Sequence, residues 1–219
     1  MLPQKEAGWV PVKHPLKHWY SVGHDLRLRP EAIEPWPKAR RATYLLRQDV
    51  KAVLSVDAQV WPSVIPEGSD WRGPFGIWQD FSTLQAAAGD SNADGWWVEI
   101  AMHERDVARV ASCELKPMGS VTRRKPLGYD VADAYLLSGL SNCSDPLDSR
   151  QVLVSTWATR LNEWHLFSDF DDAQAFAALS DGRIERHAPF FVFALFRVLK
   201  GLAPPSVDFR PPRRRSHTR

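Results

Sequence analysis

The segment 127–143 reads Leu127-Gly-Tyr-Asp-Val-Ala-Asp-Ala-Tyr-Leu-Leu-Ser-Gly-Leu-Ser-Asn-Cys143 and is bounded by Pro126 and Pro146. It is compact and lightly charged, unlike an ordinary surface helix. Residues 130–137 have helical character, and helical spacing places four residues on one face: Val131, Ala134, Tyr135 and, directly after this range, Ser138. We therefore expect a short helix and then a Gly-Leu-Ser-Asn-Cys turn. The residues expected to hold the core together here are Tyr129, Val131, Tyr135 and Cys143.

The rest of the chain also predicts helices, at 38–53, 80–88, 151–163, 168–179 and 188–200. Asp80 is placed to cap the second of them, and Gly89 stands where a left-handed C-cap belongs. Ser168 begins a capping box. Because the last helix is apolar nearly all round, we expect it to be central.

Two segments predict one small antiparallel sheet. Residues 96–103 read as a strand with Trp97, Glu99, Ala101 and His103 on one face, and a second strand is expected at 107–115. The two would pair through the turn Glu104–Asp106. Residues 1–30 show no clear period and are expected to form an irregular arm.

The predicted fold class is α+β: a helix-rich single domain with a small antiparallel sheet around residues 96–115 and a helical C-terminal third. The domain is expected to span residues 1–202. Residues 203–219, which are basic and rich in Pro and Arg, are predicted to be a flexible tail.

Charge is unevenly distributed along the 219 residues. Residues 51–200 hold fourteen Lys and Arg against twenty Asp and Glu, whereas 1–50 and 201–219 are each basic by four charges. Such an acidic body disfavours a phosphate backbone and would attract a basic partner.

Two cysteines, Cys113 and Cys143, suit a cytosolic chain better than a disulfide scaffold. The N-terminus has no apolar signal core. The longest apolar run, 188–196, is also much shorter than the roughly 20 residues of a membrane span. We expect a soluble cytoplasmic protein.

Segment 127–143 holds the best candidates for catalysis. Ser138 is not in a nucleophile elbow, because residues 136 and 140 are leucines where Gly-x-Ser-x-Gly needs glycines. Cys143 would need a histidine brought close by folding, from among His103, His165 and His187. Asp130 and Asp133 would share a helix face and suit acid–base work, but each suits a helix start equally well. A hydrolase using these residues with a histidine stays open as an alternative.

Metal and phosphate motifs are incomplete. His103-Glu-Arg-Asp106 lacks the second histidine of a zinc helix, because residue 107 is Val107. Asp169, Asp171 and Asp172 resemble metal ligands, but the capping box accounts for two of them. No Gly-rich phosphate loop occurs. We expect no metal and no cofactor.

Nucleic-acid binding is a second alternative. It would use the basic face of the predicted helix 38–51 and the arginines of the tail, which are Arg210, Arg213, Arg214, Arg215 and Arg219. The mixture of basic and aromatic residues that marks a recognised RNA-binding fold is missing, which makes this reading less favoured.

The pieces 127–133 and 137–143 resemble small cytoplasmic bacterial proteins, and the general layout is similar to that of immunity proteins of toxin–immunity pairs. The resemblance implies a non-enzymatic protein that occludes the active site of a cognate toxin, which the charge predicts to be basic. Tryptophans and acidic residues of the loops before this segment are the expected partner contacts: Trp71, Trp78, Asp90, Asp94 and Trp96.

Overall fold

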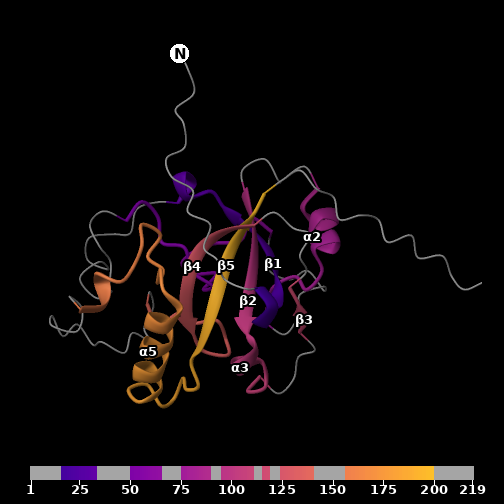
Figure 1. Cartoon of the computed structure of the whole chain (residues 1–219). Helices are drawn as coiled ribbons and strands as arrows, with labels where there is room; N and C mark the ends of the chain where they lie inside the picture. The colour runs from indigo at the N-terminus through magenta and orange to yellow at the C-terminus, as the bar shows by residue number, and fades with distance from the viewer. Residues whose placement is uncertain are drawn as a thin grey trace, which may run out of the picture.

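The computed structural model describes residues 16–33, 50–65, 75–89, 95–110, 115–118, 124–140 and 156–199. Its centre is a five-stranded sheet in the order β3-β1-β2-β5-β4, with all neighbours antiparallel (Figure 1). The strands are β1 (Trp19–Leu28), β2 (Gly95–His103), β3 (Lys116–Pro117), β4 (Arg124–Ala132) and β5 (Phe191–Val198).

Both faces of the sheet are buried along its central strands. On β2, Trp97 and Ala101 point to one face and Val98 and Ile100 to the other, and every residue from Gly95 to Met102 is buried. We call the first face the helix face, because it packs against α2 and α5, and the second the loop face, because residues 52–61 cover it. Strands buried on both sides need continuous apolar sequence, which β2 and β5 supply.

Two helices pack on the helix face, one towards each edge (Figure 1). The helix α2 (Phe81–Ala88) begins at Asp80, whose carboxylate accepts from the Thr83 amide. The longer α5 (Phe170–Asp181) begins at Asp169, whose carboxylate accepts from the amides of Asp171 and Asp172. Short turns complete the described elements: η1 (Leu16–His18), η2 (Pro30–Ala32) and α3 (Glu104–Val107).

The helix-rich fold class is wrong, because the structure is sheet-rich and lacks a helical C-terminal third. The predicted helix 188–200 is strand β5, although its expected burial is correct. An apolar run without clear period fits a strand buried on both faces as well as a buried helix, and its Phe and Val residues favour the strand.

Three further elements were also predicted wrongly. The helix expected at 130–137 is the end of β4 followed by a turn, and the arm expected at 1–30 contains β1. The strand expected at 107–115 does not form over 107–110, where α3 ends in a turn, and β2 instead pairs with β1 and β5.

Other predictions are confirmed or lie outside the described residues. The strand at 96–103 and the helices at 80–88 and 168–179 are present, the last capped by Asp169 and not by Ser168. Residues 38–49, 141–155 and 203–219 lie outside the described part, and residues 50–54 are not helical. The division at residue 202 stays a prediction. Within the described residues, no helix combines the length and apolar character needed to cross a membrane.

We predict that Gly128→Ala destabilises the fold by several kcal/mol. Gly128 forms a bulge in β4 at φ +142°, and a Cβ there would lie 2.7 Å from the Leu166 Cβ and 2.8 Å from the Phe167 carbonyl oxygen. Gly76→Ala is the matched control, because Gly76 also has positive φ but open space around it, so only a cost of about 1 kcal/mol is expected. Urea unfolding measures both. If both variants lost the same free energy of unfolding, the neighbours of Gly128 would be able to move aside for the added methyl group at no extra cost.

Candidate functional site

Asp130 lies at the centre of a buried hydrogen-bond junction. Its side chain, fully buried on β4, accepts from the Ser55 hydroxyl at 2.6 Å and the Val56 amide at 2.9 Å through one oxygen. The other oxygen accepts from the Ser138 hydroxyl at 2.6 Å and the Val131 amide at 2.8 Å. Burial raises the pKa of Asp130 to about 6, although these hydrogen bonds oppose the rise.

Asp133 organises the turn that follows β4. One carboxylate oxygen accepts from the amides of Tyr135 at 2.8 Å and Leu137 at 2.9 Å, as in an Asx turn. The other oxygen lies 2.8 Å from the His187 Nδ1. Asp133 is 1% exposed, so this small turn is built around a buried carboxylate that has a partner at each oxygen.

The turn has two features that local stability does not favour. Leu136 adopts a left-handed conformation with φ 60°, which costs a non-glycine residue about 1–2 kcal/mol. Tyr135, at its tip, is 85% exposed and is the one exposed large apolar side chain among the residues that the structure describes. The expectation that Tyr135 belongs to the core is therefore wrong.

The structure brings the expected catalytic residues together, but not as a catalytic group. The Ser138 hydroxyl donates to Asp130, whereas the His187 Nδ1 contacts Asp133. The serine and the histidine therefore bind different carboxylates. Asp130, Asp133 and Ser138 are all buried, and backbone amides supply much of their bonding. The serine–histidine pair expected of a hydrolase is therefore not formed in this described cluster, where Ser138 bonds to a buried carboxylate. Cys143 lies outside the described residues.

The other two histidines considered for catalysis lie elsewhere. His165 is buried with its Nε2 3.1 Å from the Leu140 carbonyl oxygen, and the His103 Nδ1 accepts from the Arg105 amide at the start of α3. No group of three or more His, Cys, Asp or Glu in the described ranges is placed to hold a metal ion.

A second buried polar cluster lies on the helix face between α2 and α5. Glu99 on β2 is 2% exposed and receives Arg124 of β4 through two hydrogen bonds, at 2.5 and 3.1 Å. The His24 Nε2 lies 3.6 Å from the same carboxylate. Burial lowers the pKa of His24, so its ring is neutral near pH 7. The negative charge of Glu99 is therefore compensated by Arg124 alone within this cluster.

Sequence reasoning missed this cluster and a second buried ion pair on the loop face. There the Arg27 Nε lies 2.9 Å from the Asp25 Oδ2. The Arg27 guanidinium also donates to the carbonyl oxygens of Trp61 and Val56. A charged residue inside an apolar strand, as Glu99 is, was the available signal. Its partner could not be read locally, because Arg124 is 25 positions away.

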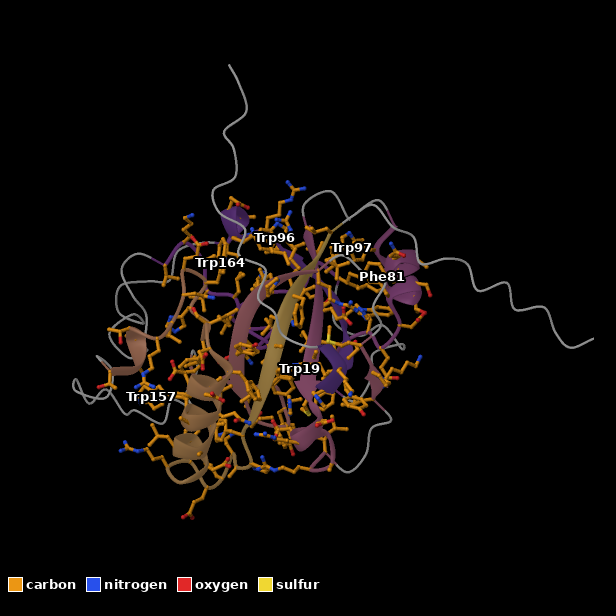
Figure 2. The ribbon with its side chains drawn as sticks, viewed as in Figure 1. Trp19, Phe81, Trp96, Trp97, Trp157 and Trp164 are labelled. Carbon is orange, nitrogen blue, oxygen red and sulfur yellow. The ribbon has the colours of Figure 1, made fainter. Side chains whose placement is uncertain are left out.

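The predicted partner contacts have different locations. Trp78 is 1% exposed in the core beside α2, which does not favour direct contact with a partner. Trp96 is 9% exposed, and its ring centre lies 4.1 Å from the Arg197 guanidinium carbon. Its ring also makes an edge contact with Trp164, with 5.8 Å between the ring centres (Figure 2). Trp71, Asp90 and Asp94 lie outside the described residues. The role of all five stays a prediction.

Comparison with known proteins gives no relative. No family model matches the chain, and neither a curated protein nor a solved structure matches it. No family or homologue therefore indicates an enzyme.

We predict that acid stabilises the wild-type protein relative to Asp130→Asn. Because the pKa of Asp130 is raised from 3.8 to about 6, the folded protein binds this proton more tightly than the unfolded chain between those pH values. The stability difference between the two proteins should grow as pH falls from 7 to about 4, by at most about 3 kcal/mol. Urea unfolding across this range measures it, and a difference independent of pH would contradict the raised pKa.

We also predict that Glu99→Leu costs about 3–5 kcal/mol, since it leaves Arg124 buried without its counter-charge. The double variant Glu99→Leu/Arg124→Leu should be more stable than Glu99→Leu alone, because no uncompensated charge remains. Chemical denaturation of these two proteins and of the single variant Arg124→Leu tests this. A double variant that loses the sum of the two single losses would show that the charges do not interact.

Proposed function

We propose that this chain is a non-enzymatic protein-binding protein of the immunity type, which docks on a protein toxin and occludes its active site. The observation that carries the proposal is the exposed Tyr135 on the turn held by Asp133. Tyrosine is among the residues that contribute most to binding energy at protein interfaces.

Preorganisation of the turn supports a binding role. Ordering a side chain or loop at an interface costs free energy that is subtracted from affinity, about 0.5–1.5 kcal/mol for each flexible side chain. The Asp133 carboxylate already holds the amides of Tyr135 and Leu137, so the backbone beneath the ring is ordered before a partner arrives. A ring presented in this way binds with a smaller entropic loss.

The backbone strain supports the same role. Strained residues persist where surrounding structure holds them, and they cluster at binding and catalytic sites. The left-handed Leu136 is 5% exposed, so its side chain anchors the turn to the loop face while Tyr135 projects outward. Because the buried polar groups nearby bond to one another, the exposed ring is the part of this segment available to another molecule.

We predict that the chain co-purifies with the product of a neighbouring gene and abolishes that protein's toxicity. The test is to express the chain with each neighbour and to measure complex formation by size-exclusion chromatography and growth of cells producing the neighbour. An unrelated acidic protein of similar size is the control for non-specific charge effects. If no neighbour binds and none of them is toxic, the proposal fails.

A further inference from the structure

We infer that the contact surface is formed by Tyr135 together with the exposed turn 182–187, and that it fits a partner protein presenting a recess for an aromatic ring with an acidic rim. This inference rests on the proposed function and adds the site and the chemistry of the partner. Both segments lie at the end of the sheet where β4 ends and β5 begins, the lower end in Figure 1.

One carboxylate fixes the two segments against each other. Asp133 holds the Tyr135 amide on one oxygen and lies 2.8 Å from the His187 Nδ1 through the other. The turn that carries His187 is itself ordered, because the amides of Ile184 and His187 donate to the carbonyls of Ser180 and Ile184, both at 2.9 Å. The backbone that carries the Tyr135 ring and this turn are therefore fixed relative to each other.

Charge on this surface is locally basic. Arg183 and Arg186 are exposed and three residues apart, with Glu185 as the exposed acidic residue between them. Among the described residues here, two other acidic groups are engaged within the protein: Asp133 is buried, and Asp181 accepts from the Phe190 amide at 2.6 Å and lies 3.8 Å from Arg109. Arginine and tyrosine together are the composition typical of interface hot spots.

Local charge, not the net charge of the chain, determines what fits here. At physiological ionic strength charges are screened beyond about 8 Å, so the charged residues of the contacting surface dominate the interaction. The acidic body formed by residues 51–200 predicted a basic partner, with Asp90 and Asp94 as contacts. On this surface the arginines of the turn 182–187 favour an acidic rim instead.

The test uses the neighbouring-gene product that binds the wild-type chain, with affinity and association rate measured by surface plasmon resonance. We expect Tyr135→Ala to weaken binding by at least about tenfold, whereas Tyr135→Phe, which keeps the ring, should retain most of the affinity. Arg186→Glu should slow association severalfold, and more strongly at low salt. Lys116→Glu is the matched control, since Lys116 is exposed on β3 at the opposite edge of the sheet and should change little.

The outcomes separate the inference from the proposed function. If a partner binds the wild-type chain and Tyr135→Ala equally well, the surface is wrong and the proposed function stands. If Arg186→Glu speeds association, the partner is basic and the acidic rim is wrong. If no neighbour binds, both proposals fail. Tyr135-dependent binding of a labelled single-stranded oligonucleotide of about 15 bases would identify nucleic acid as the occupant and would also overturn the inference.

A separate control shows whether each variant still folds. Because Tyr135 and Arg186 are exposed, their replacement should change stability by no more than about 0.5 kcal/mol. Unchanged circular dichroism and melting temperature therefore assign any lost affinity to the surface.

Discussion

The carboxylate of Asp130 is the interaction on which the arrangement of the segments around β4 depends. A buried carboxylate without donors would cost several kcal/mol, and here four donors surround it. They come from β4 itself, from residues 55–56 on the loop face and from Ser138 beyond the turn. Because the charge is satisfied only when all three segments are in place, this one side chain disfavours arrangements in which the loop face is covered differently.

Elements with local signals could be predicted from the sequence, and elements defined by distant contacts could not. The helices α2 and α5 are marked by capping residues within a few positions, and β2 by a short run of tryptophan, valine and isoleucine that follows a turn. The strand β5 was mistaken for a helix because its apolar run is compatible with either structure. The strand is buried between α5 on one face and residues 52–61 on the other. Contacts with segments so distant in the sequence cannot be recognised from the apolar run alone.

The candidate site shows the same division. The sequence marked Asp130, Asp133 and Ser138 as unusual, and the structure does bring Ser138 onto Asp130. Their roles could not be inferred, because a helical spacing was assumed where a strand ends in a turn. The donors that make Asp130 structural include Ser55, which is 75 positions away. The same helical spacing predicts that Tyr135 belongs to the core. In the structure the residue lies in a turn, and its side chain is exposed.

The turn 133–137 combines two choices that folding stability alone would not favour. A glycine at position 136 would adopt the left-handed conformation without the steric cost that Leu136 bears. A polar residue at position 135 would avoid the exposed apolar area of a tyrosine that is 85% accessible. Both features are maintained by Asp133, which needs its own buried partners in order to remain in the interior. The structure therefore uses buried polar groups to fix the backbone that carries an exposed ring, which is what the proposed binding role requires.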